Sequence, residues 1–300
     1  MRLLVVYGIK TADYGYLTEF YPARRIAGEC ANRSIPLRFL FPPDVPAFLA
    51  APSTARERSG TICLIRGTVS PDLVMHIEES GYRCVNSSRS LRLANDKLAS
   101  FDFLSAHGWP TPKTMSADQF TQPAKFPLIA KPRFGSRGEG VKLLASPADI
   151  PALPDDTILQ EYIAYSRGRD LRAFFAGRRV LAVVERQGPA EALVSNSSAG
   201  GTMSTPPFGA QLPEKYQGLV LDIARESGLW YGSVDFLYCP SDNSGAAAED
   251  EDKLNLTVCE LNGSPGFEAL EKDCGINIAG ALIDALDERA LVESQADGSA

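Results

Sequence analysis

Short apolar runs alternate with stretches of helical periodicity along the first 95 residues of the chain. The runs Arg2–Tyr7, Leu37–Phe41 and Thr61–Gly67 are rich in aliphatic residues and predict strands. Strands that alternate with helices predict a small α/β unit built on a parallel sheet. We expect the proline-rich segment 41–53 to be a loop between these elements.

The pattern changes near residue 95, where we expect a second module to begin. Residues 90–108 have amphipathic spacing and predict one helix, which Gly108 and Pro110 close. Beyond this helix, apolar runs predict strands at 126–132, 141–145, 157–163, 233–238 and 256–262.

Other segments join these strands. Residues 170–186 predict a hairpin that turns at Gly177, residues 195–204 a polar Gly/Ser loop, and residues 214–227 a helix. The acidic, low-complexity segment 241–253 is expected to be a solvated loop, because like charges without apolar partners are costly to bury.

Composition is that of a folded globular protein. At about 150 residues per domain, 300 residues suggest about two domains. The net charge of −7 argues against a surface that tracks nucleic-acid phosphates. No apolar run approaches the ~20 residues of a membrane span, and the first one is too short for a signal peptide. We therefore expect a cytoplasmic protein without a nucleic-acid or membrane partner.

Cysteine and histidine are sparse. The six cysteines are far apart and form neither a C-x-x-C pair nor a Cys/His cluster, so we expect reduced thiols and no zinc site. The two histidines, His76 and His107, fall in expected surface helices. No nucleophile signature accompanies them, and triad chemistry is not expected.

The first candidate for chemistry is a lysine followed by a glycine-rich loop. Lys131 ends an apolar strand, and Gly135, Gly138 and Gly140 follow between two strands. Glycines let backbone N–H groups approach anionic oxygens, although a glycine-rich turn without a ligand is the commoner case. Lys131 favours the interpretation that the loop binds an anionic ligand, because a buried ammonium without a counter-charge costs several kcal/mol.

The second candidate is an all-oxygen set. Glu260 and Asn262 are two residues apart, so on a strand their side chains share one face, and a neighbouring strand can bring Asp235 beside them. Two carboxylates and an amide suit Mg²⁺, whose remaining ligands are substrate phosphates. The alternative is that these are ordinary polar residues at strand ends.

The third candidate is cationic. Arg172 follows Asp170 after one residue, and Arg186 ends the second strand of the hairpin, so the two arginines can face the same cleft. The planar guanidinium suits bidentate binding of carboxylate or phosphate, although a solvated arginine is the commoner case in a hairpin.

Taken in order, these segments resemble the ATP-grasp superfamily, in particular the RimK-like amino-acid ligases, over about residues 60–290. Residues 95–114 resemble that family's DK helix, 126–144 its lysine strand and phosphate-covering loop, and 157–163 its hinge segment beside adenine. The most specific match is 260–283, which resembles the metal-binding strand, the N-x-S-P-G turn, the start of a Glu-containing helix and the G-I-x-I-A segment.

The resemblance implies an α/β fold with α+β lobes, namely an ATP-grasp fold preceded by a Rossmann-like pre-ATP-grasp domain. It divides the chain into an N-terminal domain (1–92), a central lobe with the phosphate loop (93–165), a C-terminal lobe with the metal site (166–292) and a flexible tail (293–300). ATP would bind between the central and C-terminal lobes.

The resemblance also implies roles for individual residues. ATP would be bound by Lys97 and Lys131 at its phosphates, by Gly135, Ser136, Gly138 and Gly140 over them, by Gln160, Glu161, Tyr162 and Ile163 around adenine, and by Asp170 near the ribose. Mg²⁺, or Mn²⁺ in its place, would be held by Asp235, Glu260 and Asn262. The catalytic residues would be Arg172, Arg186 and Asn196, the two arginines facing the reacting phosphate or the substrate carboxylate.

The implied function is that of an ATP-dependent carboxylate–amine ligase. A carboxylate would attack the γ-phosphate of ATP to give an acyl phosphate and ADP, and an amine would then displace phosphate to form an amide. We expect an amino acid to be joined to a small metabolite or peptide, and dimers or tetramers are common in the family. Two alternatives stay open: a modifier that adds amino acids such as glutamate to a polypeptide tail, and a nucleotide-binding regulator without catalysis.

One segment departs from the family's glutamate-adding protein modifiers. The loop before Gly200 offers basic side chains in those ligases, whereas this chain has Val194, Ser198 and Ala199. The departure favours a less anionic amine donor or a different acceptor.

Overall fold

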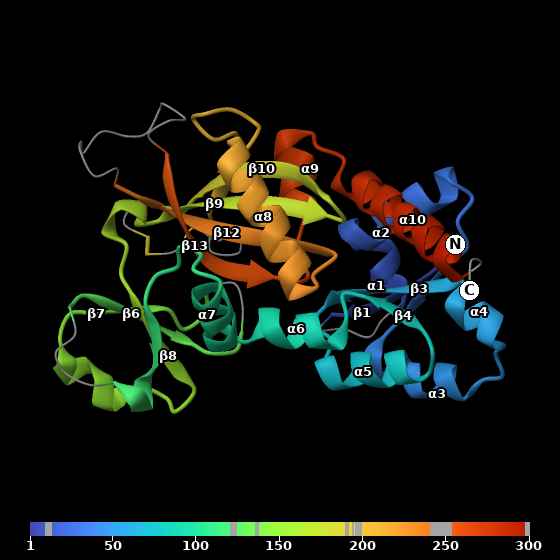
Figure 1. Ribbon diagram of the computed structural model, residues 1–300, viewed down its shortest axis with the longest axis horizontal. Helices are drawn as coiled ribbons and strands as arrows, with labels where there is room; N and C mark the ends of the chain where they lie inside the picture. The colour runs from blue at the N-terminus through green and yellow to red at the C-terminus, as the bar shows by residue number, and fades with distance from the viewer. Residues whose placement is uncertain are drawn as a thin grey trace.

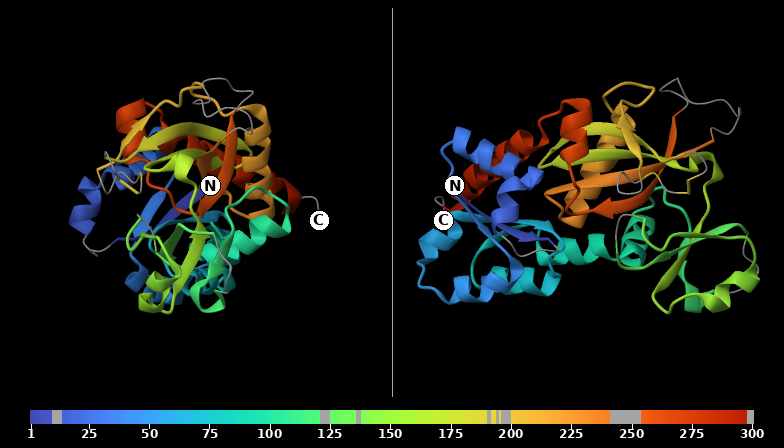
Figure 2. Two further views of the ribbon diagram at one scale, coloured as in Figure 1. Left: turned by 90° about the vertical axis from the view of Figure 1, so that its left-hand side faces the viewer. Right: turned by 180° about the vertical axis from the view of Figure 1, so that it is seen from behind.

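The part of the chain that the structure describes contains three β-sheets with flanking helices (Figure 1). The computed structural model describes residues 1–9, 14–120, 125–135, 138–189, 192–193, 195, 200–240 and 254–297, without the side chains of 151–152 and 291–297. The N-terminal sheet lies at one end of the molecule and the central sheet at the other, while the C-terminal sheet lies between them along the long axis (Figure 1 and Figure 2).

The N-terminal sheet has four parallel strands in the order β2-β1-β3-β4. They are β1 (Arg2–Gly8), β2 (Leu37–Leu40), β3 (Thr61–Gly67) and β4 (Arg83–Val85), so the three expected strands are confirmed. The helices of this part are α1 (Tyr14–Glu19), α2 (Tyr21–Asn32), α3 (Val45–Ala50), α4 (Ala55–Ser59) and α5 (Pro71–Glu79).

The prediction of a loop over 41–53 is wrong. A 3₁₀ turn at Pro42–Asp44 leads into α3, and Val45 anchors this helix with a side chain that is 1% exposed. Prolines fit there because the first turn of a helix needs no N–H from them.

The single helix expected at 90–108 is two helices, α6 (Ser88–Asn95) and α7 (Lys97–Ala106). Asp96 separates them with an extended backbone, and its carboxylate accepts hydrogen bonds from the N–H groups of Leu98 and Ala99. Aspartate is a favoured N-cap residue because it satisfies such donors. The break puts Lys97 at the first position of α7.

The central sheet has the strand order β5-β8-β6-β7 with antiparallel pairs. Its strands are β5 (Thr114–Ser116), β6 (Leu128–Pro132), β7 (Lys142–Leu144) and β8 (Thr157–Glu161), with 3₁₀ turns at Ala117–Gln119 and Pro147–Ala152. Leu128, Leu144 and Leu159 form the centre of a small core under this sheet.

The C-terminal sheet has the order β11-β10-β9-β12-β13. Its strands are β9 (Arg169–Ala176), β10 (Arg179–Gln187), β11 (Thr202–Ser204), β12 (Tyr231–Cys239) and β13 (Asn255–Asn262), and a 3₁₀ turn at Ala164–Ser166 precedes them. The hairpin turning at Gly177 is confirmed, whereas β11 occupies part of the loop expected at 195–204. The acidic segment 241–253 lies outside the described residues.

Helices cover both faces of the C-terminal sheet. Helix α8 (Glu214–Ser227), where a helix is expected, packs against Leu171 and Phe175 on one face. Helices α9 (Glu268–Cys274) and α10 (Ile278–Asp297) pack on the other face, with Phe174 and Ala176. Residues of β9 therefore alternate between two cores, as successive residues of a strand do.

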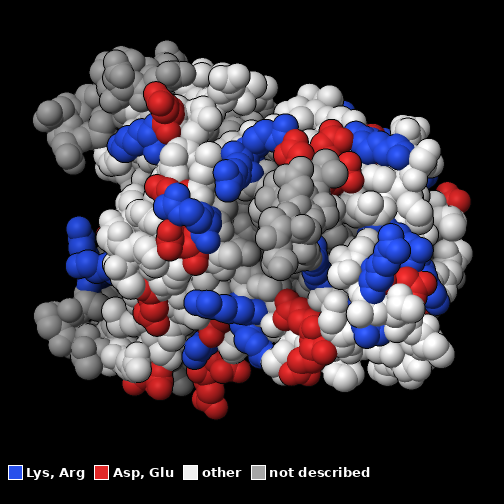
Figure 3. Space-filling view, turned by 45° about the vertical axis from the view of Figure 1, so that its right-hand side comes forward, with Lys and Arg blue, Asp and Glu red and all other residues white. Residues whose placement is uncertain are grey.

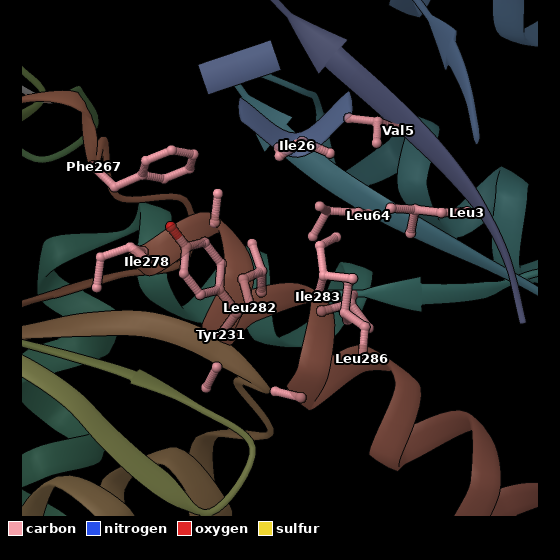
Figure 4. Packing of buried hydrophobic residues seen from close by; sticks show 14 of the residues in the cluster. Leu3, Val5, Ile26, Leu64, Tyr231, Phe267, Ile278, Leu282, Ile283 and Leu286 are labelled. Atoms are coloured by element: carbon pink, nitrogen blue, oxygen red, sulfur yellow. The ribbon is translucent and has the colours of Figure 1, made fainter. Parts of the chain in front are cut away.

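The N-terminal sheet and the C-terminal sheet share the core that contains α10 (Figure 4). Leu3, Val5 and Leu64 from the N-terminal strands meet Leu282 and Ile283 from α10. These buried residues join the two ends of the chain into one body, whereas the central sheet has a core of its own.

Basic and acidic side chains are interspersed on the face of the molecule shown in Figure 3. Within the described residues, none of the helices combines the length and the apolar character that crossing a bilayer requires.

Candidate functional site

A cleft lies between the central sheet and the C-terminal sheet. It encloses about 940 Å³ including its open mouth. The expected site residues that line it are Lys97, Lys131, Gly135, Gly138, Gln160, Glu161, Tyr162, Ile163, Asp170, Arg186, Asp235 and Glu260. Among the other described candidates, Gly140, Arg172 and Asn262 are not part of its lining. Ser136 and Asn196 lie outside the described residues.

Lys131 is a buried cation in the wall that the central sheet contributes. It lies on β6 and is 7% exposed. Its Nζ donates to Oε1 of Gln160 on β8 at 3.0 Å, and the Gln160 amide donates in turn to Thr114. Within the described part of the chain, no carboxylate forms an ion pair with Lys131. A buried ammonium whose partner is a neutral amide favours an anionic ligand.

Lys97 reaches the same cleft from the N-terminus of α7. Its Nζ donates to the carbonyl oxygen of Gly135 at 2.7 Å and lies 3.8 Å from Oε1 of Glu260. Burial lowers the pKa of this lysine, and the nearby Glu260 carboxylate counteracts that effect in part. Lys97 thus links the glycine-rich loop to β13.

The glycine-rich loop has a backbone that other residues adopt only with strain. Gly135, Gly138 and Gly140 have φ values of +117°, +73° and +75°. At Gly140 a Cβ atom would also lie 2.9 Å from Cγ of Pro132. The spacing of the glycines therefore reflects a loop conformation that brings its backbone to the cleft.

A buried network of two arginines and two aspartates forms the opposite wall. Arg172 and Asp235 face each other in the register of β9 and β12, and Arg186 faces Asp170 in that of β10 and β9. The Arg172 guanidinium donates to both Asp235 oxygens at 2.8 and 2.6 Å. The Arg186 guanidinium donates to both Asp170 oxygens at 2.6 and 2.7 Å, and to Asp235 at 2.7 Å.

The network favours the charged forms of Asp235 and Arg186. Burial by itself raises the pKa of Asp235, but Arg172 and Arg186 outweigh it and hold this pKa below the usual range. Burial lowers the pKa of Arg186, and Asp235 and Asp170 more than reverse that effect. Two cations and two anions thus sum to no net charge. Of the two arginines, Arg186 lines the cleft, while Arg172 holds Asp235 from β9.

The three expected metal ligands lie together. Asp235 faces Glu260 in the register of β12 and β13, and Asn262 faces Ser233 two residues away on the same side, with a bulge next to Asp235. The Glu260 side chain is 32% exposed, whereas Asp235 is 3% exposed and both its oxygens accept bonds from arginine.

This donor set fits a hard divalent cation. It consists of two carboxylates and an amide oxygen, which are the ligand types that Mg²⁺ accepts alongside phosphate oxygens. In the described residues no group of three or more His, Cys, Asp or Glu side chains could hold a metal by itself. Glu260 is the readily available ligand, while a metal at Asp235 would replace one of its arginine bonds.

Ser195, Arg169 and Phe134 are among the cleft residues that the sequence reasoning did not identify. Ser195 donates to Asp170 at 2.5 Å, and nothing distinguishes this serine within a polar loop. The guanidinium of Arg169 lies 4.6 Å from the ring centroid of Tyr238, a packing that depends on strand pairing. Phe134 is 53% exposed beside the glycine-rich loop, and an aromatic residue next to such a loop is a signal that could have identified it.

Known proteins resemble this chain in sequence and in fold. Residues 94–286 match the model of the RimK-like ATP-grasp domain. A probable alpha-L-glutamate ligase of Haemophilus ducreyi is 33% identical over 215 residues, which cover 67% of this chain and 65% of that protein. A protein of the same name from Legionella pneumophila (strain Corby) is 28% identical over 232 residues, covering 73% and 71%. The chain therefore spans about two thirds of the length of these relatives.

Solved structures share the fold. The D-alanine–D-alanine ligase from Bacillus anthracis complexed with ATP has a TM-score of 0.67 and 16% identity, covering 99% of both chains. The ATP-grasp ligase PsnB complexed with a minimal precursor has a TM-score of 0.65 and 17% identity, covering 96% of this chain and 99% of that one. The expected ATP-grasp fold is thereby confirmed.

Proposed function

Because this chain belongs to the RimK-like ATP-grasp family, we propose that it is an ATP-dependent ligase that joins a carboxylate to an amine and releases ADP and phosphate. We propose that an amino acid is one substrate and a small metabolite or a peptide the other. The described N-terminal sheet, the central sheet and the C-terminal sheet would correspond to the three parts expected at 1–92, 93–165 and 166–292.

The observation that carries the proposal is a pair of lysines, Lys131 on the central sheet and Lys97 on α7, that line the same cleft. Lys131 is 7% exposed and bonds to a neutral amide, and Lys97 lies at the edge of the glycine-rich loop. A polyphosphate placed in the cleft gives both ammonium groups an anionic partner and receives backbone N–H groups from the loop. The segment from Gln160 to Ile163 lines the same cleft and leaves room for a base beside it.

The chain's residues can support both steps of the reaction. An oxygen of the substrate carboxylate attacks the γ-phosphorus, the bond to the β,γ-bridging oxygen breaks, and ADP leaves with both bonding electrons. The amine then attacks the acyl carbon and loses a proton, and phosphate leaves. Phosphoryl transfer needs positioning and charge neutralisation more than a protein nucleophile. Lys97 and Lys131 would hold the phosphates, and Arg186 would donate to developing negative charge.

The oxygen set is proposed to hold the metal that accompanies ATP in this family. Glu260, Asp235 and Asn262 would bind Mg²⁺, which neutralises charge on the phosphate oxygens when bound. Arg172 would keep the Asp235 carboxylate in one orientation, since it bonds to both of its oxygens.

A second candidate function is the addition of glutamate to a polypeptide tail. It is favoured by two relatives named as probable alpha-L-glutamate ligases. The residues that depart from the glutamate-adding pattern, Val194, Ser198 and Ala199, lie outside the described residues. The two candidates differ in what ATP turnover requires: a modifier releases ADP with glutamate only when a polypeptide acceptor is supplied.

The test measures ADP release while pairs of candidate substrates, drawn from amino acids, other carboxylates and peptides, are supplied together. Mass spectrometry then detects the amide product. Glu260→Gln should remove Mg²⁺-dependent ADP formation and leave thermal stability close to that of the wild type, because this side chain is a third exposed. Glu288→Gln, at a surface pair with Arg179, is the matched control and should keep full activity. Full activity of Glu260→Gln would refute the metal assignment. ATP binding without ADP release for any pair would favour a non-catalytic regulator.

A further inference from the structure

We infer that Arg66 and Asn86 of the N-terminal part are positioning residues for Asn262, the candidate metal ligand at the end of β13. They hold the turn that follows this strand, residues 262–265, from outside the lobe that contains it. The inference rests on the proposed function, because it assigns these residues to the same metal site.

Arg66 is a buried cation without an acidic partner in the described residues. It lies near the end of β3 and is 2% exposed. Its guanidinium donates to the carbonyl oxygen of Pro265 at 3.0 Å and to the hydroxyl of Tyr231 at 2.9 Å, and that hydroxyl donates to the same carbonyl at 3.0 Å. The Arg66 carbon Cζ also lies 5.2 Å from the ring centroids of Tyr231 and Phe267, two members of the buried cluster drawn in Figure 4.

This arrangement is a costly way to fill a core. A buried guanidinium loses its hydration, and Nε of Arg66 has no hydrogen-bond partner among the described residues. An apolar side chain of similar length would pack there without that cost. What the arginine provides beyond packing is a fixed position for the Pro265 carbonyl.

Asn86 fixes the same turn from β4's side of the sheet. It is 1% exposed, and its amide nitrogen donates to the carbonyl oxygens of Tyr231 and Gly263 at 2.6 and 2.7 Å. Its amide oxygen accepts from the N–H groups of Trp230 and Tyr231 at 2.8 and 3.1 Å. All four hydrogen-bonding positions of this side chain are therefore used to join the start of β12 to the end of β13.

These contacts lead directly to Asn262. The N–H of Gly67, next to Arg66, donates to Oγ of Ser264 at 2.9 Å. The N–H of Ser264 donates to Oδ1 of Asn262 at 2.9 Å, which orients the amide oxygen that the proposed metal needs. A turn clamped on both sides presents this oxygen in one geometry, as residues that bond to metal ligands commonly do.

A purely structural role in holding the two parts of the chain together is the competing explanation, and the chain offers a control for it. Arg25 on α2 also crosses from the N-terminal part, bonding to Glu271 at 2.8 Å and to Asn277 at 2.7 Å. These contacts are made to α9 and to the segment after it, not to the turn 262–265.

The experiment compares Arg66→Met with Arg25→Met in the full chain. Binding of Mn²⁺ in the presence of a non-hydrolysable ATP analogue is followed by electron paramagnetic resonance, and thermal unfolding is measured in parallel. Arg66→Met should weaken Mn²⁺ binding by about tenfold with little change in the unfolding temperature. Arg25→Met should lower the unfolding temperature and leave Mn²⁺ binding unchanged.

Two milder variants keep the inference open to refutation if Arg66→Met does not fold. Arg66→Lys retains one donor for Pro265 and should recover part of the Mn²⁺ affinity, and Ser264→Ala, which removes the acceptor for the Gly67 N–H, should weaken it. Mn²⁺ binding within twofold of the wild type in all the folded variants of Arg66 and Ser264 would overturn this inference and leave the proposed function untouched. A wild-type protein that binds no Mn²⁺ with the analogue would overturn the metal site of the proposed function itself.

Discussion

Replacing Asp235 by asparagine tests the buried charged network at its centre. Asp235 is 3% exposed and accepts three hydrogen bonds from Arg172 and Arg186. The substitution keeps the shape of the side chain and removes its charge. Arg186 then keeps the carboxylate of Asp170, whereas the guanidinium of Arg172 loses the carboxylate to which it bonds, and the asparagine NH₂ group has to face a donor.

The expected loss of stability follows from this imbalance. Breaking a buried ion pair by removing one partner costs about 3–5 kcal/mol, because a charge stays buried without compensation. With an unfolding entropy of about 2.1 cal/mol/K per residue, a chain of 300 residues loses about 1.6 °C for each kcal/mol. Asp235→Asn should therefore lower the unfolding temperature by about 5–8 °C.

Thermal unfolding followed by circular dichroism measures this difference, with Asp222→Asn as the control. Asp222 pairs with Arg225 on the surface of α8, its side chain is 46% exposed, and its removal should cost at most about 1 kcal/mol. An unfolding temperature of Asp235→Asn within about 2 °C of the wild type would refute the reasoning, because the arginines would then be satisfied without the carboxylate.

The pH dependence gives a second check. The pKa of Asp235 is lower in the folded chain than its ordinary value of about 3.9, so its stabilising effect is complete above that value and is lost as the pH falls through the folded pKa. The stability difference between the wild type and Asp235→Asn should stay constant from about pH 8 to pH 5 and shrink below about pH 4. A difference that grew in acid would contradict the assignment.

Three further substitutions test the other parts of the site. Lys131→Met removes a buried cation that bonds only to Gln160 among the described residues, so it should leave stability nearly unchanged while weakening ATP binding by at least tenfold, as measured by isothermal titration calorimetry. Gly140→Ala brings a Cβ within 2.9 Å of Pro132 at a φ of +75° and should therefore raise the KM for ATP. A KM equal to that of the wild type would show that ATP binding does not depend on this loop conformation. Asp96→Ala removes the cap of α7 together with the ion pair between Asp96 and Arg133, and should lower the free energy of unfolding by at least about 1–2 kcal/mol in a urea titration, whereas an unchanged midpoint would contradict the capping role.

Some parts of the candidate site can be predicted from local patterns in the sequence. Lys131 could be identified from the sequence because a lysine stands at the end of an apolar strand, and the glycine-rich loop because three glycines lie within six residues. Both signals are local. The break at Asp96 was missed although aspartate is a favoured N-cap residue, because the apolar spacing on either side of it continues as in one helix.

Arg172 shows the limit of such reasoning. Its residue type and its place in the hairpin predict an arginine that faces the cleft, as Arg186 does. The register of β9 against β12 instead places it opposite Asp235, where it bonds to both carboxylate oxygens. A hairpin sequence carries no information about the strand that pairs with its other edge, so this role depends on the assembled sheet.

The sequence by itself determined the strands expected from apolar runs, the turn at Gly177, the glycine-rich loop and the resemblance to the family, because periodicity, glycine positions and local motifs depend on neighbouring residues. The tertiary structure decided which side chains meet. Asp235 and Glu260 face each other through pairing of two strands, and Arg66 and Asn86 reach residues about 150 to 200 positions away. Such contacts arise when separate elements pack and their polar groups must find partners, and spacing along the chain does not specify them.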